Sequence, residues 1–593
     1  MKKVLLLIVL FTGFCSAQYA VRSPYLLQPE KAIGYVDSCA RFWNKAYDNS
    51  LGGFYTNVDK YGNASGNKNT LSQSRDAYGY VRAFMLTGNE TYLNFARNAL
   101  NFMYQHAWDK TNSGWFTNLD KNGNPVNSKE NKDAFNQHYA LLGITAYFEA
   151  TGDTLDWSWL MKGYVNNEQK LWDRRQGFEG YYDNVTYNWA SKSGKSFNAT
   201  VDAITTHTLY LYLLTGDAQY KDKLLKITDN MMKYLAGSMD AQKTGFVEKF
   251  DANWNWDNSD KMTIMGHVLK TAWCLGRAYQ ISPDTSFITA AKKLVKSVMD
   301  KGYDHQYGGP YKDYDRTTGQ MLMWGVADTA KAWWQMEQAV TAGLELYDIT
   351  KDEEYLKMAD ESLDFFMKYF VDHQYGEVYS DRTRDGRKVP QWGEEKGSSG
   401  KAAYHSTELG YYVYLYGNLF YKKAPVSLYY YLKADSTERS VYLYPLAIQD
   451  SRLKIRDVTL EGVQYADFNS AARTLRLPAG KGGKFRVTFE LNEVTSVASN
   501  KGQAPDAFSL MQNYPNPFNP ATRIRYSVGA PASQVTLRVY DVLGNLAATL
   551  VNEVKDKGTY EVSFDASHLA SGIYFYRLQS GNNVISRKMT LLK

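Results

Sequence analysis

The stretch GGFYTNVDKYGN (residues 52–63) combines two glycines, an aromatic pair, an acidic residue and a closing Gly-Asn, a pattern typical of a short β-hairpin. Similar stretches follow as SGWFTNLDKNGN, GFEGYYDNVTYNW, GFVEKFDANWNW, GGPYKDYDRTTG and GEVYSDRTRDG. Successive copies lie 61 to 67 residues apart, measured between Gly53, Gly114, Gly180, Gly245, Gly309 and Gly376. A regular period of this length indicates six structural repeats.

A second signal recurs out of phase with the hairpins and reads as a short turn between two helices. Its copies are LTGNETYL, ATGDTLDW, LTGDAQYK, ISPDTSFI and ITKDEEYL. Each period therefore holds two helices, with the hairpin loop closing the unit, and six periods predict about twelve helices. We expect an all-α (α/α)6 toroid over residues 18–424. An open helical solenoid is the alternative that periodicity alone leaves standing.

After residue 425 the pattern changes to the alternation of half-buried strands, as in VSLYYYL and KFRVTFEL. We expect a small β-domain over residues 425–491 and a polar linker over 492–508. The tail, residues 509–593, contains NYPNPFNP and SGIYFYRL and resembles the C-terminal sorting domain of type IX secretion cargo, a β-sandwich. This resemblance implies a partner in the type IX secretion machinery and a secreted or cell-surface location.

The remaining composition narrows the class of protein. Residues 1–17, MKKVLLLIVLFTGFCSA, have the order of a secretory signal peptide, and no later apolar run is long enough to predict a transmembrane helix in the mature chain. Only Cys39 and Cys274 follow it, too few for a disulfide framework or a cysteine metal site. The 68 basic and 62 acidic residues nearly balance, without a basic run, so no nucleic-acid partner is predicted.

Polar and ring-bearing residues recur near the starts of the six predicted inner helices. They are Arg75, His138, His207, His267, Trp334 with Glu337, and His405. Four of the eight histidines of the chain belong to this set. One histidine on an inner helix would more often be a core residue, but four from separate repeats at one mouth of a toroid favour a site.

Five short motifs at these helix starts carry a resemblance over residues 30–423. They are QSRDAYGYVRAF, TTHTLYLYLLTGD, MGHVLKTAW, WWQMEQA and KAAYHSTEL. In this order they resemble the N-acylglucosamine 2-epimerase family, which includes cellobiose 2-epimerases and mannose isomerases. The resemblance implies a reaction without metal or redox cofactor, in which a base removes the proton next to the carbonyl of an open-chain sugar and an acid returns it through an enediolate.

The resemblance also implies residue roles. His267 and His405 would be the acid/base pair on opposite faces of C2, and Arg75 and His207 would hold the enediolate oxygens. These roles suit the chemistry, because a weakly acidic C–H needs a base poised near neutral pH and a donor beside the developing charge. The substrate-binding candidates are Trp334, Trp392, His138, Lys270 and Glu337. Trp334 could equally be a packing residue of the barrel. For Trp333, packing is the better explanation than contact with a sugar.

The motif MGHVLKTAW departs from the family, which usually carries a glutamate three residues after the histidine, where this chain has Lys270. Residues three apart share one helix face. An ammonium beside an imidazole favours the neutral ring. We therefore expect Lys270 to keep His267 neutral and to contact an oxygen or acid group of the substrate.

Two functions other than epimerisation are also compatible with the sequence. The same toroid hosts glycosidases and lyases, which need paired carboxylates, and carboxylates lie near the inner-helix starts. They are Asp76, Asp133, Asp202, Asp328, Glu394 and Glu395, of which Asp133 and Asp202 also fit helix-capping positions. A surface carbohydrate-binding protein without activity is the third possibility.

Overall fold

The computed structural model describes residues 19–591 except for short gaps. These gaps are 324–325, 328, 391, 444, 446, 449–451, 493–507, 512, 514–517, 519, 530, 542–544, 571 and 582. The predicted signal peptide and nearly all of the predicted linker lie outside the described residues. The chain divides between Asn492 and Glu493 into two compact units, each described here by itself.

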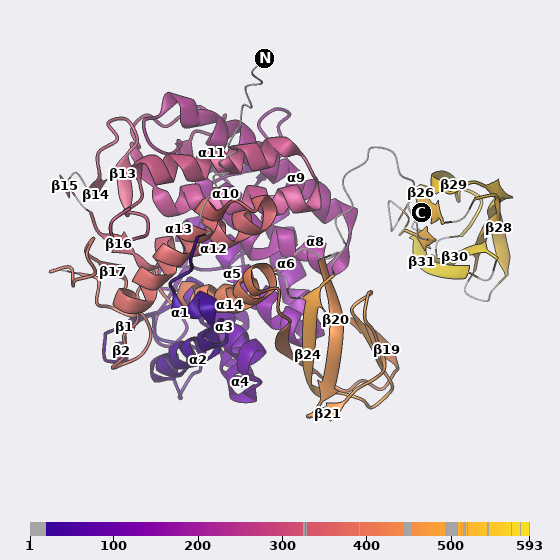
Figure 1. Ribbon diagram of the computed structural model, residues 1–593, viewed down its shortest axis with the longest axis horizontal. Helices are drawn as coiled ribbons and strands as arrows, with labels where there is room; N and C mark the ends of the chain where they lie inside the picture. The colour runs from indigo at the N-terminus through magenta and orange to yellow at the C-terminus, as the bar shows by residue number, and fades with distance from the viewer. Residues whose placement is uncertain are drawn as a thin grey trace, which may run out of the picture. The chain divides into compact units, whose positions relative to one another are not determined.

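Six inner helical segments contact one another in turn in the first unit, the mainly helical part of Figure 1. They are α3 (Thr70–Thr87), α5 (Ala134–Thr151), α7 (Phe197–Ala203) with its continuation α8 (Leu209–Thr215), α10 (Met265–Ile281), α12 (Trp333–Thr350) and α14 (Tyr404–Tyr416). Each segment contacts the next, and α14 contacts α3. The ring is thus closed, and the expectation of a helical toroid is confirmed.

Six further helices pack outside this ring. They are α2 (Lys31–Trp43), α4 (Glu90–Phe102), α6 (Thr154–Lys170), α9 (Ala218–Asn230), α11 (Thr285–Lys301) and α13 (Glu353–Phe365). The inner helices are buried along most of their length, whereas the outer ones bury a single face. The predicted turns join the two sets: Gly88, Gly152 and Gly216 end inner helices in the left-handed conformation, which glycine adopts without strain.

The hairpins link neighbouring repeats in addition to pairing within themselves, as β1 (Asn57–Val58) does with β2 (Ala64–Ser65). The short strand before each inner helix pairs with a strand of the next hairpin along the chain. These pairs are β3 (Lys68–Asn69) with β4 (Asn118–Leu119), β5 (Lys132–Asp133) with β8 (Asn184–Val185), β10 (Lys195–Ser196) with β11 (Lys249–Phe250), β12 (Met262–Ile264) with β13 (Asp313–Asp315), and β16 (Lys331–Ala332) with β17 (Asp381–Arg382). A bridge between Val58 and Gly397 joins the last repeat to the first.

Buried lysine–aspartate pairs reinforce five of the six repeats. Each joins an aspartate before the hairpin to a lysine before the inner helix, at 2.7 to 3.1 Å: Asp48–Lys68, Asp109–Lys132, Asp173–Lys195, Asp304–Lys331 and Asp372–Lys396. In the fourth repeat Thr263 stands in place of the lysine, and Asp240 instead meets the exposed Lys293. The fourth repeat is also the one whose inner helix carries His267.

The strands after residue 425 form two sheets beside the toroid. One has the order β18 (Val426–Leu432), β24 (Gly483–Leu491), β20 (Leu453–Leu460), β21 (Val463–Gln464), and the other the order β19 (Arg439–Tyr442), β23 (Thr474–Leu477), β22 (Phe468–Asn469). Strand β18 packs on α3 and α5. Leu428 and Tyr430 belong to the same hydrophobic cluster as the helices, so these sheets share the core of the toroid.

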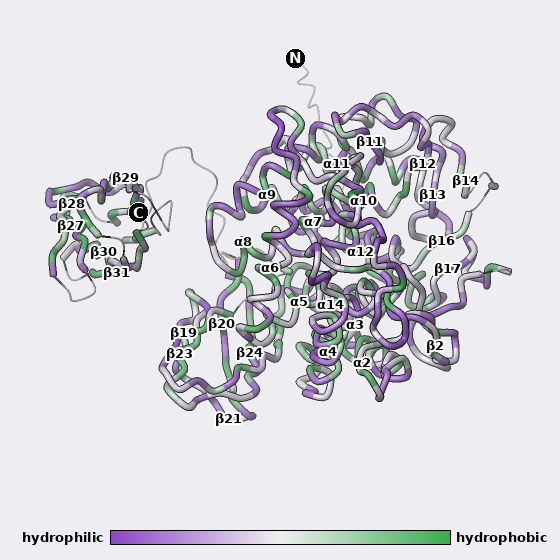
Figure 2. The backbone as a smooth tube through the Cα atoms, turned by 180° about the vertical axis from the view of Figure 1, so that it is seen from behind, coloured by the Kyte–Doolittle hydropathy of each residue, from purple (hydrophilic) through white to green (hydrophobic). Residues whose placement is uncertain are grey.

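The second unit consists of two antiparallel sheets. One contains β25 (Ser509–Leu510), β26 (Ala521–Val528) and β29 (Gly558–Asp565); the other contains β28 (Leu546–Lys555), β27 (Ser533–Tyr540), β30 (Gly572–Ser580) and β31 (Asn583–Leu591). Buried and more exposed residues alternate along most of β26 and β27, and Figure 2 shows hydrophilic and hydrophobic colours interspersed in this unit. Ile524, Leu537 and Tyr576 contribute to one core of their own. None of the described helices has the length and apolar character needed to cross a bilayer.

Candidate active site

A pocket of about 250 Å³ opens where the inner helices begin. Every inner segment of the ring contributes to its wall. The lining residues are Arg75, Phe135, Tyr139, Phe197, Asn198, Asp202, His267, Lys270, Trp333, Trp334, Gly400 and His405. The sequence-based set is therefore brought together only in part: Arg75, His267, Lys270, Trp334 and His405 meet here.

His267 lies on the first turn of α10 and is fixed on two sides. Its Nδ1 lies 2.9 Å from Glu248 Oε2, a residue of the fourth hairpin. Its ring stacks on Phe197, with 3.8 Å between the ring centroids. A carboxylate at Nδ1 fixes the orientation of the ring and leaves Nε2 for the pocket. The carboxylate beside this histidine thus comes from the hairpin, although position 270 is a lysine.

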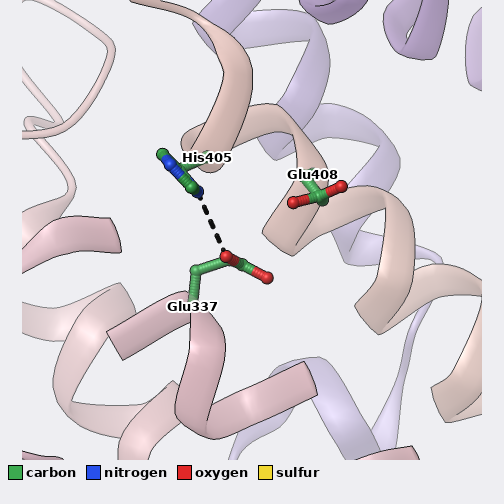
Figure 3. Close-up of side chains that lie close together, drawn as sticks. All are labelled: Glu337, His405 and Glu408. Carbon is green, nitrogen blue, oxygen red and sulfur yellow. Dashed lines mark hydrogen bonds and ion pairs between the residues drawn. The ribbon is translucent and has the colours of Figure 1, made fainter. Parts of the chain in front are cut away.

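His405, at the start of α14, is held in a similar way by a carboxylate (Figure 3). Its Nδ1 lies 3.2 Å from Glu337 Oε2. Burial, followed by the charges of Arg75, Lys270 and Lys401, holds the pKa of His405 well below its usual value. The ring is therefore neutral at neutral pH.

Glu337 itself is fully buried and does not line the pocket. Glu337 was expected to contact substrate. Its carboxylate instead faces His405 Nδ1 and accepts a hydrogen bond from Thr341. Within the described residues, Glu337, His405 and Glu408 place one ligand-type atom each within 4.8 Å of the others, the arrangement that could hold a metal ion.

Lys270 is buried and paired with Asp202, at 2.6 Å between Nζ and Oδ1. It also donates to the hydroxyl of Tyr139, and Asn198 donates to the second oxygen of Asp202. Burial alone would lower the pKa of Lys270, but the carboxylate of Asp202 raises it above the usual value. Lys270, expected to keep His267 neutral and to contact the substrate, lines the pocket, and its charge is matched by that of Asp202.

Arg75 offers the pocket a positive charge without a carboxylate partner among the described residues. Its Nη1 donates to the carbonyl of Gly400 at 2.6 Å, and its guanidinium lies 4.4 Å from the ring centroid of Tyr139. Its buried Nε has no hydrogen-bond partner within the part of the chain that the structure describes. The guanidinium can therefore hold an anionic oxygen in the pocket.

Two tryptophans on the first turn of α12 line the pocket. The ring centroid of Trp334 lies 5.2 Å from that of His267 and 6.0 Å from that of His405. Trp333, expected as packing, is also part of the wall. Trp392, expected to stack on the sugar, is 39 % exposed and not part of it.

His138 and His207 lie behind the pocket rather than in its wall. Both are fully buried, with 5.2 Å between their ring centroids. His207 falls on a π-helical turn, Ile204–Thr208, and its Nδ1 meets the hydroxyl of Thr206 at 2.9 Å. Burial lowers the pKa of His138 to about 4 and that of His207 well below its usual value. They were expected to contact substrate, but neither is part of the pocket wall, to which α5 contributes Phe135 and Tyr139 and the third inner segment contributes Asp202.

The carboxylates proposed for hydrolysis are mostly committed elsewhere. Asp133 caps α5, as expected, but α7 is capped by Ser196, so Asp202 is not a cap. Glu394 pairs with Lys60 and Lys388. Asp76 and Glu395 lie outside the pocket wall, and Asp328 lies outside the described residues. The described lining thus includes one carboxylate, Asp202, and hydrolysis requires two.

Sequence reasoning missed Glu248, Asn198, Tyr139 and the aromatic walls Phe135 and Phe197. Glu248 lies in the fourth hairpin, and its Oε1 accepts from the backbone N–H of Ile264, the residue directly before α10. Asn198 and Asp202, spaced four apart on one helix face, were the available signal.

Comparison with known proteins places this site in a family. The model of the N-acylglucosamine 2-epimerase family matches residues 53–408, which include the helices and hairpins that build the pocket. The chain belongs to this family. Among its relatives, a cellobiose 2-epimerase of Ruminococcus albus is 24 % identical over 385 residues, covering 62 % of this chain and 94 % of the relative.

Other members agree with this assignment. A D-mannose isomerase of Marinomonas mediterranea is 23 % identical over 354 residues, covering 57 % of this chain and 84 % of the relative. The structure of a cellobiose 2-epimerase from Spirochaeta thermophila superimposes with a TM-score of 0.58 at 21 % identity, covering 67 % of this chain and 98 % of that one. These likenesses support the toroid.

The tail belongs to a second family. The secretion system C-terminal sorting domain matches residues 512–591. This domain directs its chain through type IX secretion, so the epimerase-family unit is carried on a chain destined for the cell surface or the extracellular space.

Proposed function

We propose that this chain is a secreted carbohydrate epimerase or isomerase that acts at C2 of a reducing sugar. The observation that carries the proposal is that two imidazoles, His267 and His405, face one pocket and are each held through Nδ1 by a carboxylate. Membership of the N-acylglucosamine 2-epimerase family supports it.

The pocket suits removal of a proton next to a carbonyl. His405, kept neutral by burial, takes the proton from C2 of the open-chain sugar through Nε2, and the electrons of the C–H bond move onto the carbonyl oxygen. The guanidinium of Arg75 stabilises the resulting enediolate oxygen. His267 returns a proton to the opposite face of C2, which inverts the centre. Protonation at C1 instead, with the proton of the O2 hydroxyl passing to O1 as the C2 carbonyl forms, converts an aldose to a ketose, so both reactions share the first step.

Further contacts of the sugar follow from the wall of the pocket. Trp333 and Trp334 offer flat apolar surfaces to the C–H faces of a sugar. The Lys270–Asp202 pair offers both a donor and an acceptor to vicinal hydroxyls. The names of the relatives, cellobiose 2-epimerase and D-mannose isomerase, suggest a reducing mono- or disaccharide.

We also propose the finer division of the chain. Six inner and six outer helices support the description as an (α/α)6 toroid over residues 18–424, with the β-domain at 425–491. We assign residues 1–17 as a signal peptide, 492–508 as a linker and 509–593 as the β-sandwich sorting domain with the type IX machinery as its partner.

The proposal is tested by incubating the protein with cellobiose, mannose and glucose in heavy water and recording deuterium at C2 by NMR. Deuterium at C2, with formation of the epimer or the ketose, is expected, and the His405→Asn variant should lose it. New reducing ends would indicate hydrolysis, and binding without any exchange would indicate a binding protein; either result would overturn the proposal.

A further inference from the structure

Two buried carboxyl groups lie together beneath His405. Figure 3 shows Glu337 on α12 and Glu408 on α14 on the same side of the imidazole, with the hydrogen bond from His405 going to Glu337. Ligand-type atoms of the three residues lie within 4.8 Å of one another. Both carboxyl groups are at most 1 % exposed, so water does not separate their charges.

The charges around this pair do not balance two carboxylates. The facing cation is Lys270 on α10, whose ammonium is already 2.6 Å from Asp202. The other groups that face Glu408 are tyrosines: Tyr78 from α3, Tyr210 from α8, and Tyr404 and Tyr412 from its own helix. His405 is neutral. Three carboxyl groups thus share one ammonium in a dry interior, where like charges cannot all persist.

The hydrogen bonds distinguish the two carboxyl groups. Glu337 accepts from the hydroxyl of Thr341 at 2.6 Å and from the amide of Gln338, and it faces His405 Nδ1. Such donors favour the charged form of a carboxyl group. Glu408 accepts from the hydroxyl of Tyr78 at 2.9 Å, but its Oε2 has no partner within the described part of the chain.

We propose that Glu337 and Glu408 hold one proton between them at neutral pH and that it resides on Glu408. Glu408 is then a positioning residue: its neutral form lets Glu337 remain an anion, which accepts the Nδ1 proton of His405 and leaves Nε2 as the base toward the pocket. Burial raises the pKa of both carboxyl groups, in agreement with a retained proton. This role in catalysis rests on the proposed function, whereas the shared proton does not.

The proton is tested by infrared difference spectroscopy on the full chain. The C=O stretching band of a protonated carboxylic acid is expected at pH 7 in the wild type minus the Glu408→Gln variant, and it should fade as the pH rises. The exposed Glu354→Gln variant is the matched control and should give no such band. A wild-type spectrum without the band, or a stoichiometric divalent metal ion in the purified protein that Glu408→Gln abolishes, would overturn the proposal.

The position of the proton is tested by kinetics and stability. Glu337→Gln should lower kcat by about 10²-fold with little change in KM, because His405 loses its anionic acceptor. Glu408→Gln should lower kcat less than about tenfold and should shift the alkaline decline of both kcat and Tm to higher pH, because no second anion forms. The reverse order of the two kcat losses would overturn the assignment. If none of the three sugars is turned over, the Tm profile and the infrared band still decide whether the proton is shared.

Discussion

At the scale of single residues, the Lys270–Asp202 pair gives a role to the lysine at position 270, where the family resemblance led us to expect glutamate. Both side chains are buried and 2.6 Å apart, so each compensates the charge of the other. A glutamate at position 270 would instead add a fourth carboxyl group to Asp202, Glu337 and Glu408. The lysine therefore serves the electrostatics of the pocket as a whole rather than those of His267 alone.

This account predicts the stability of variants at the pair. Lys270→Met leaves a buried, unpaired carboxylate and should lower the free energy of unfolding by about 3–5 kcal/mol. The double variant Lys270→Met with Asp202→Asn removes both charges and should recover most of that loss. Urea denaturation measures both values. A loss below about 1 kcal/mol for Lys270→Met would contradict the pairing.

Glu248 gives a second prediction at this scale. Glu248→Gln keeps the size of the side chain but removes the carboxylate that faces His267 Nδ1. We expect kcat for C2 exchange to fall about 10²-fold or more with KM nearly unchanged, because the imidazole loses its fixed orientation. The neighbouring Lys249→Gln, on an exposed side chain, is the control. Equal kcat values for wild type and Glu248→Gln would exclude Glu248 from this role.

The site could be predicted from the sequence only as far as its helices. The motifs and their period predicted that Arg75, His267 and His405 lie at the same end of the toroid, and all three line the pocket. His138 and His207 share that end in sequence but are buried outside the pocket wall. His207 lies on a π-helical turn, where the α-helical period no longer predicts which face a residue presents. Glu248 could not be predicted, because its contact with His267 depends on how the fourth hairpin folds back onto the start of α10.

At the scale of elements, the buried lysine–aspartate pairs connect each hairpin to the start of an inner helix. Lys132→Met breaks the pair with Asp109 and should destabilise the chain by about 3–5 kcal/mol. In the fourth repeat, Lys293→Met breaks an exposed pair with Asp240 and should cost less than about 1 kcal/mol. Similar losses in the two variants would mean that the buried pairs are not what secures the hairpins.

The helices and turns themselves followed from the sequence, since apolar periodicity and glycine caps are local signals. The additional pairing of each hairpin with the preceding repeat did not, because it joins strands that lie far apart in the sequence. The lysines also gave no sign of burial, because a lysine is usually exposed and its partner lies more than twenty residues away in most repeats.

At the scale of the whole molecule, buried neutral histidines make the fold sensitive to acid. The pKa of His138 is about 4 in the folded chain, below the usual 6.5, so the unfolded chain binds this proton first as the pH falls. Stability is therefore lost between about pH 6.5 and pH 4, by about 3 kcal/mol for this residue. Above pH 6.5 the residue has no such effect.

Measuring the free energy of unfolding between pH 7 and pH 4 tests this predicted effect of His138. The wild type should lose about 3 kcal/mol relative to His138→Gln between pH 7 and pH 4, whereas His305→Gln, at an exposed position, should track the wild type. Parallel profiles for wild type and His138→Gln would show that His138 takes up its proton in the folded chain.

The central claim is that one open-chain sugar lies between the two imidazoles. A crystal structure with an alditol, the reduced open-chain form of the sugar, tests it most directly. The account predicts C2 between His267 Nε2 and His405 Nε2, at about 3–3.5 Å from each, with the adjoining oxygens at Arg75. An alditol bound outside this pocket, or bound in it with C2 out of reach of either imidazole, would contradict the claim.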